Sequence, residues 1–205
     1  WGGRAHVSLS TYGRLGLSGL IERVMYARLP ARLSSEWGAG RAVESRQCYE
    51  ARRRGVLVPR RGGFQPVMTL EELLGRRDQG GLIFTPDVGL HEDVAALDFE
   101  SMFPNLITRR NISYENVRLG GGTEGFLVEF TRETLERRLH FKHLRREYPK
   151  GSDERLWCEG RQLALKEILF CTYGYSGCWA NRFGNFDTFM AVSYTHLTLP
   201  TNREV

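Results

Sequence analysis

The residues best suited to chemistry fall in three short stretches of the sequence. Asp98 ends the apolar run VAAL and precedes a turn whose backbone N–H groups could face an anion. Between 132 and 148, cations recur at i, i+4 and i+7, which places them on one helix face: Arg138, Lys142 and Arg145. A carboxylate that holds a divalent metal, together with cations that hold a polyphosphate, is what phosphoryl transfer requires.

The third stretch, RQLALKEILFCTYGYSG, predicts a helix with a second functional face. Its spacing brings four side chains to one side, with Gly174 beneath the last of them: Gln162, Lys166, Phe170 and Tyr173. If this helix runs antiparallel to the preceding charged helix, with the turn near YPKGSD, both faces could point at the same phosphates.

Each of these residues also has an ordinary structural interpretation. An isolated aspartate after a strand usually caps the next turn, and a lysine such as Lys166 usually lies on a solvated helix face. Arg138 and Lys142 could pair with glutamates of their own helix, namely Glu133, Glu136 and Glu147. Tyr173 and Phe170 could be core aromatics, and for Phe170 we favour that interpretation.

The elements that must position these residues predict an α+β fold. Residues 15–54 show helical spacing with a break at Pro30. The stretch GGLIFTPDVGLHEDVAALDF predicts two strands separated by a turn that contains Pro and Gly. Charged helices are expected over 132–148 and from GSDE to about Phe170, so a partial sheet would carry a helix pair.

Composition narrows the class of protein. The 205 residues include 29 Lys and Arg against 24 Asp and Glu, which gives a net charge of +5. The arginines cluster in pairs, which either lie on solvated faces or contact a polyanion. No apolar run approaches the roughly 20 residues of a membrane span. The four cysteines lack CxxC spacing, and we expect them to be reduced in an intracellular protein.

Two motifs resemble those of one family. LDFESMFPNLI resembles the first palm motif of family B DNA polymerases, usually Asp-x-x-Ser-Leu-Tyr-Pro-Ser-Ile, and RQLALKEILFCTYGYSG resembles their fingers motif, usually Lys-x-x-x-Asn-Ser-x-Tyr-Gly. Their order and spacing also match, the similarity covers about residues 34–190, and TYGYSGCWANRFGN is similar to divergent archaeal members. The resemblance implies an incomplete polymerase fold, with a partial palm sheet and an antiparallel two-helix fingers subdomain.

The resemblance implies a role for each matching residue near the acid. Asp98 would be the catalytic carboxylate that binds Mg²⁺, with the Phe99 carbonyl assisting. Backbone amides of the next turn would hold the incoming triphosphate: Ser101, Met102 and Phe103. The ring of Phe103 would also leave no room for a 2′-hydroxyl, so ribonucleotides would be excluded.

The remaining matches lie on the helices and on an upstream loop. The triphosphate-binding cations would be Arg138, Lys142 and Lys166. Tyr173 and Gly174 would lie under the nascent base pair, while Gly80 and Gly81 match a loop near the template strand.

The sequence also departs from the family pattern. Phe170 and Cys171 stand where Asn and Ser are expected, so a polar contact near the nucleotide is lost, and Asn105 replaces a Ser in the first motif. The second catalytic acid of the family lies in a Tyr-Gly-Asp-Thr-Asp hairpin, and Asp187 in GNFDTF follows the fingers too closely to supply it. We therefore expect this chain alone to bind nucleotide weakly and to be inactive.

The resemblance also divides the chain. The expected parts are 1–33, the tail of an exonuclease-side region; 34–78, linking helices and a basic loop; 79–130, the palm; 131–178, the fingers helices; 179–192, a return towards the palm; and 193–205, a non-native read-through tail without assigned fold.

The function that these observations favour is that of a fragment of a DNA-directed DNA polymerase. The parent would bind primer–template DNA, deoxynucleoside triphosphates and Mg²⁺ for DNA replication or repair, with a sliding clamp as a further candidate partner, no membrane, and a cytoplasmic, nucleoid-associated location. The alternatives are a catalytically inactive polymerase-like DNA-binding or scaffolding protein and an unrelated helical nucleic-acid-binding domain.

Overall fold

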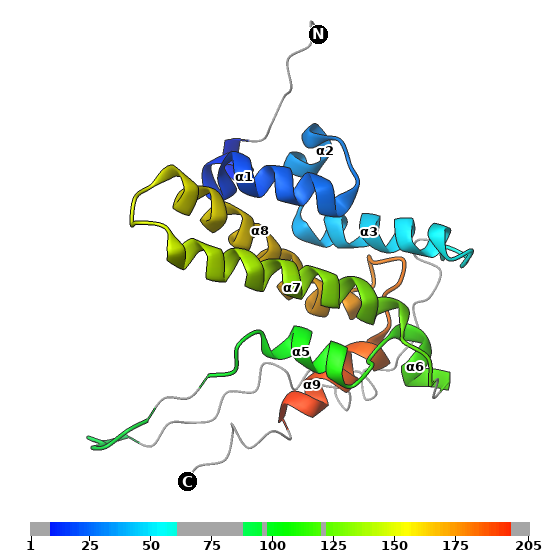
Figure 1. Cartoon of the computed structure of the whole chain (residues 1–205). Helices are drawn as coiled ribbons and strands as arrows, with labels where there is room; N and C mark the ends of the chain where they lie inside the picture. The colour runs from blue at the N-terminus through cyan, green and yellow to red at the C-terminus, as the bar shows by residue number, and fades with distance from the viewer. Residues whose placement is uncertain (1–8, 61–87, 96–97, 120–121, 198–205) are drawn as a thin grey trace, which may run out of the picture.

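The structure is a computed structural model of the whole chain, and it describes residues 9–60, 88–95, 98–119 and 122–197 (Figure 1). The helices found in these ranges are α1 (Leu9–Ala27), α2 (Ala31–Glu36), α3 (Ala39–Arg53), α5 (Met102–Arg109), α6 (Tyr114–Leu119), α7 (Phe126–Glu147), α8 (Asp153–Ser176) and α9 (Phe186–Leu197). Figure 1 shows three layers, with α1 to α3 on one side of α7 and α8, and α5, α6 and α9 on the other. None of the described helices is both long enough and apolar enough to cross a membrane.

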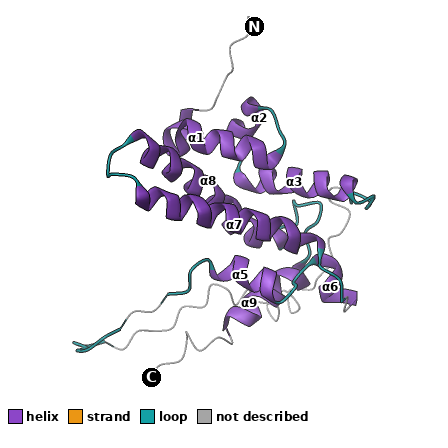
Figure 2. Cartoon of the chain, viewed as in Figure 1, coloured by secondary structure: helices purple, strands orange, loops and turns teal. Residues whose placement is uncertain are grey.

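The expected α+β fold with a partial palm sheet is wrong for the part of the chain that the structure describes. Across these residues there is no strand (Figure 2). Within the region where two strands were expected, Val88, Leu90 and Val94 are 100%, 92% and 74% exposed. A strand must pair its backbone and bury one face against other elements, and these residues do neither. Residues 80–87 and 96–97 of that region lie outside the described ranges.

The first layer packs on α8 through small residues. Pro30 separates α1 from α2, at the break that the sequence predicts. Where α1 crosses α8, a Cβ atom added to Gly19 would lie 2.6 Å from the carbonyl oxygen of Gly160, so the two backbones approach closely. Arg23 of α1 is 1% exposed and pairs with Glu167 of α8 at 3.7 Å.

The two longest helices, α7 and α8, lie side by side and run antiparallel (Figure 1). The side chain of Ser152 caps α8 by accepting a hydrogen bond from the Arg155 amide, and Asp153 and Glu154 complement the helix dipole in the first turn. At the start of α7, the Leu127 amide donates to Ser113 Oγ at 2.9 Å. The N-terminal ends of both helices are therefore fixed by side chains.

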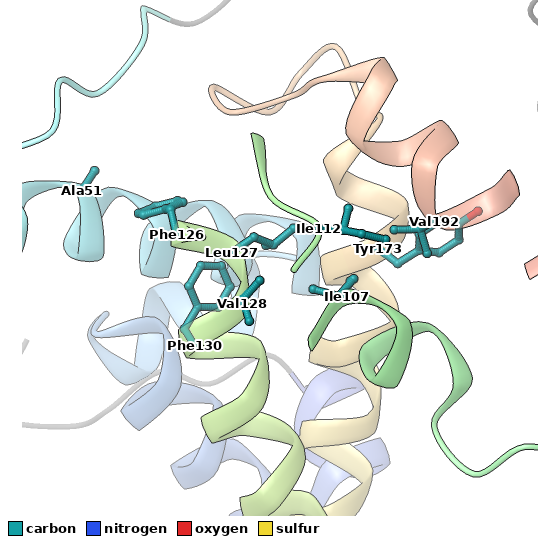
Figure 3. Packing of buried hydrophobic residues seen from close by; sticks show 9 residues of the cluster. All are labelled: Ala51, Ile107, Ile112, Phe126, Leu127, Val128, Phe130, Tyr173 and Val192. Atoms are coloured by element: carbon teal, nitrogen blue, oxygen red, sulfur yellow. The ribbon is translucent and has the colours of Figure 1, made fainter. Parts of the chain in front are cut away.

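The main apolar core, which Figure 3 shows, lies where the third layer packs on α7 and α8. Residues of α3, α5, α7, α8 and α9 and of the segment after α5 contribute to this cluster: Ala51, Ile107, Ile112, Phe126, Leu127, Val128, Phe130, Tyr173 and Val192. Because α5 packs against both α7 and α8, its N-terminal end is held beside the helix pair.

Candidate active site

Ser101 begins the site, at the residue before α5. Its backbone lies in the left-handed region (φ 52°, ψ 47°), a conformation that costs a residue with a side chain about 1–2 kcal/mol. Its hydroxyl accepts a hydrogen bond from the guanidinium of Arg138 on α7 instead of capping α5. Arg138 is 9% exposed, and burial lowers its pKa, an effect that the charge of Glu100 opposes. The start of α5 is thus joined to the middle of α7.

The next cation along α7 makes a second connection of the same kind. Lys142 Nζ donates a hydrogen bond to the carboxylate of Glu100, the residue before Ser101. This hydrogen bond lowers the pKa of Glu100, although the side chain is half exposed. Arg138 and Lys142 therefore reach residues of the first motif, rather than glutamates of their own helix.

The third cation of this face has a different partner. Arg145 donates to the carboxylate of Glu159 on α8, and so ties the two long helices together near their connection. The row that the sequence predicts is thus divided between two contacts to the first motif and one to α8.

An aromatic stack joins the first motif to α8. The ring of Tyr173 lies between Phe103, with centroids 4.2 Å apart and planes 11° apart, and Phe189 of α9, at 4.9 Å and 15°. The Tyr173 hydroxyl and Ser193 Oγ are 2.6 Å apart and hydrogen-bonded. Tyr173 is 8% exposed, so it packs inside the core (Figure 3). Helix α9 continues past Val192, where the native sequence was expected to end.

The expected common face of α8 is divided by the structure. Lys166 and Phe170 point to solvent, and Phe170 is 65% exposed, whereas Gln162 and Tyr173 are buried. The prediction that Phe170 is a core residue is therefore wrong. Because four residues advance an α-helix by about 400°, Phe170 rotates away from the side on which Gln162 and Tyr173 lie.

The expected metal centre is incomplete in the described part of the chain. Asp98 is exposed in an irregular segment, and Phe99 is 50% exposed. Nowhere in the described ranges do three or more His, Cys, Asp or Glu residues gather so that they could hold a metal ion. A two-metal site needs more than one carboxylate, and Glu100 already binds Lys142, so these residues by themselves do not fit such a site.

Two of the expected site residues cannot be placed, and two contacts of the site were not predicted from the sequence. Gly80 and Gly81 lie outside the described residues. The contact of Glu100 with Lys142 was missed, although their opposite charges were a signal. The hydrogen bond between Tyr173 and Ser193 had no signal in the local pattern.

A cavity of about 440 Å³ lies away from this site, among α1, α3, α7 and α8. Most of its charged lining is paired: Arg137 binds Glu22, and Arg46 binds Glu133 at 2.6 Å. These ion pairs connect layers of helices and are distinct from the residues around Ser101.

Comparisons with known proteins agree with the two motifs. Residues 39–124 match the model of DNA polymerase family B. The chain is 26% identical over 188 residues to DNA polymerase 2 of Saccharolobus solfataricus, covering 86% of this chain and 28% of the relative. It is 30% identical over 182 residues to DNA polymerase 2 of Aeropyrum pernix, covering 78% of this chain and 20% of the relative.

A solved structure shows the same fold. The family B DNA polymerase of Pyrobaculum calidifontis matches with a TM-score of 0.65 and 24% identity, over 92% of this chain and 27% of that protein. The chain spans less than a third of the length of each of these relatives. The resemblance drawn from the two motifs is confirmed: this chain is similar to family B DNA polymerases, archaeal members among them.

Proposed function

We propose that this chain carries the first palm motif and the fingers helices of a DNA-directed DNA polymerase, a nucleotidyltransferase that adds deoxynucleotides to a primer 3′ end and releases pyrophosphate. The observation that carries the proposal is the contact of Arg138 and Lys142 with Ser101 and Glu100. Cations of α7 and the turn of the first motif are thereby within reach of the same ligand, and phosphoryl transfer depends on such positioning.

The triphosphate would bind where these groups converge. The amides of Ser101, Met102 and Phe103 lie at the start of α5, where helix N–H groups and the dipole favour an anion. Arg138, Lys142 and Lys166 would supply positive charge. Because Lys142 binds Glu100 in the free chain, a triphosphate would have to compete with that carboxylate.

The stacked aromatics would define the sugar end of the site. Phe103 would pack against the deoxyribose, and its position on Tyr173 limits how far the ring can retreat from a bulkier sugar. Tyr173 would support Phe103 from within the core, and Gly174 would leave space for the base pair.

Asp98 would be one of the carboxylates of a Mg²⁺ site, with the Phe99 carbonyl as a further ligand. The metal would neutralise the charge of the triphosphate. A second carboxylate would have to come from outside the described residues, so we expect this chain alone to bind nucleotide weakly and to lack primer extension.

The proposed partners are primer–template DNA and deoxynucleoside triphosphates, with a role in replication or repair inside the cell, at the nucleoid. The arginine clusters would contact phosphates, so affinity for DNA would fall steeply with salt. Gly80 and Gly81 would lie near the template, and a sliding clamp is a further proposed partner.

A second candidate function is an inactive polymerase-like DNA-binding or scaffolding protein. Phe170 and Cys171 in place of Asn and Ser favour it. Asp98, at the position of the catalytic acid, favours the active enzyme.

Primer extension by the full-length protein that contains this chain distinguishes the two. Asp98→Ala should abolish extension and leave DNA binding within about twofold, because an exposed side chain contributes little to folding. Glu92→Ala, another exposed acid of the same segment, is the matched control and should keep activity. Equal extension by Asp98→Ala and the parent would contradict the catalytic role, and a parent that binds DNA without extending it would favour the scaffold.

A further inference from the structure

Phe170 is an exposed aromatic side chain in the middle of a long helix. It is 65% exposed on α8, although its neighbour Leu169 is 2% exposed. An aromatic ring in water forgoes the stabilisation that burial would bring, roughly 25 cal/mol per Å² of apolar area. The chain keeps this ring outside the core, where it is available for a contact outside the fold.

The face that carries Phe170 also carries a cation and a glycine. Lys166, Phe170 and Gly174 are spaced by four residues and all are exposed, so they occupy three successive turns of one open face. A Cβ atom added to Gly174 would have nothing within 4 Å. Leu163, 36% exposed, extends the apolar surface at the other end.

This face lies on the same side of the helix pair as the cations of α7. Glu159 is seven residues before Lys166 and therefore on the same face of α8. It receives the hydrogen bond of Arg145, which shares a face of α7 with Arg138 and Lys142. The open face of α8 and the cations that reach the first motif therefore border one surface.

Spacing and charge decide what kind of ligand fits this surface. Four residues of helix rise about 6 Å, so Phe170 stands one turn from Lys166 and one turn from Gly174. A nucleoside triphosphate has an anionic end and a flat, weakly polar end. With its phosphates at the cations, the sugar and base would extend over Phe170 towards the space above Gly174.

We propose that Phe170 packs against the nucleoside part of the incoming nucleotide and so recognises it by apolar contact and stacking, at a position where related polymerases carry Asn. The inference rests on the proposed function and adds a specificity-determining residue to it. Stacking of a base on an exposed aromatic ring is a recurrent and sequence-tolerant way to hold nucleotides.

The test compares two ligands that differ only in the nucleoside. dATP and inorganic tripolyphosphate are titrated by calorimetry into the 205-residue chain without divalent cations. Phe170→Ala should weaken dATP binding about 5- to 100-fold, the range for loss of one stacked base, and change tripolyphosphate binding less than twofold. Phe170→Trp should keep dATP affinity, and Lys166→Ala should weaken both ligands.

Controls separate this role from folding and self-association. Leu156→Ala removes another exposed apolar side chain of α8, 60% exposed and far from Phe170 along the helix, and should change neither affinity. Circular dichroism should show unchanged helix content in every variant. Sedimentation should give the same mass for parent and Phe170→Ala.

The outcomes are distinct for the two proposals. If Lys166→Ala weakens both ligands but Phe170→Ala weakens neither, or weakens both equally, Phe170 has no nucleoside contact and the nucleotide site stands. If the parent sediments with a larger mass than Phe170→Ala, the ring belongs to a contact between copies of the chain. If the parent binds neither ligand, this inference fails, whereas the proposed function is tested separately by primer extension with the full-length protein.

Discussion

The helix pair of α7 and α8 and the segment that leads into α5 meet at the candidate active site, but different interactions hold them. Between the helices, Phe141, Cys158 and Leu165 form a buried cluster. The described residues between 88 and 99 are irregular and exposed, and polar side chains connect the end of this segment to α7. The helix pair that carries the cations is therefore built by packing, whereas the position of the acidic side depends on hydrogen bonds and charge.

The two regions should accordingly respond to different changes. Loss of apolar volume in the helix pair removes the scaffold on which the cations stand. Loss of a polar contact at Ser101 or Glu100 leaves that scaffold intact and alters how the first motif is presented. The following predictions test this difference, beginning with the largest effect on stability.

Phe130→Ala should destabilise the fold by about 3–5 kcal/mol, because Phe130 is 1% exposed in the core and its loss leaves a cavity. Phe170→Ala is the matched control, since the same side chain is removed from a position that is 65% exposed, and it should change stability by less than about 0.5 kcal/mol. Urea unfolding followed by circular dichroism measures both. Similar losses for the two variants would contradict the assignment of core and surface.

Gly160→Ala should destabilise by about 1–3 kcal/mol, because a Cβ atom there would lie 2.6 Å from the carbonyl oxygen of Leu15 and would push α1 away from α8. Gly174→Ala on the same helix meets nothing within 4 Å and should stabilise by about 0.5–1 kcal/mol through helix propensity. Opposite shifts in the melting temperature would support the close crossing. A gain in stability for both would show that α1 does not pack there.

The sequence predicts the helix pair well because its signals are local. Both helices are long, their charged and apolar residues repeat with helical spacing, and Ser152 with two acids marks the start of α8. The expected sheet was wrong for the described residues because a short apolar run says nothing about a pairing partner, and Val94 is 74% exposed.

The site could be predicted in part, for a related reason. The motifs brought Ser101, Phe103, Arg138 and Tyr173 to attention, but the contacts among them join residues distant in sequence. The hydrogen bond from Lys142 to Glu100 spans 42 positions and that between Tyr173 and Ser193 spans 20. Such contacts depend on how the layers pack, which periodicity does not specify.

Tyr173→Phe should cost about 1 kcal/mol, because it removes the hydroxyl that is hydrogen-bonded to Ser193 while it keeps the stack on Phe103. Tyr49→Phe, at a 40% exposed position, should have almost no effect and serves as the control. Chemical denaturation provides the two free energies of unfolding. Equal stability of Tyr173→Phe and the parent would mean that α9 does not dock on α8 through this hydroxyl.

The smallest effect is expected at the acidic side of the site, where the pair of Glu100 and Lys142 is half exposed. Because the hydrogen bond from Lys142 lowers the pKa of Glu100 below its usual 4.5, the pair stabilises the fold above that pH, and the contribution disappears as pH falls through the folded-state value. Exposed pairs contribute a few tenths of a kcal/mol, so Glu100→Gln should be less stable than the parent by about that amount at pH 7.

The difference between these two proteins should vanish in acid, because the parent carboxylate is then protonated and resembles the amide of the variant. Thermal unfolding of parent and variant between pH 7 and pH 3 measures this convergence. Glu36→Gln is a suitable control, since Glu36 forms an exposed pair with Arg32 away from the site. At neutral pH, Glu100→Gln should also bind tripolyphosphate more tightly than the parent, since Lys142 no longer has a carboxylate to release. Weaker binding in that variant would mean that Glu100 positions the lysine for the anion rather than competing with it, and the acidic side would then be preorganised like the helix pair.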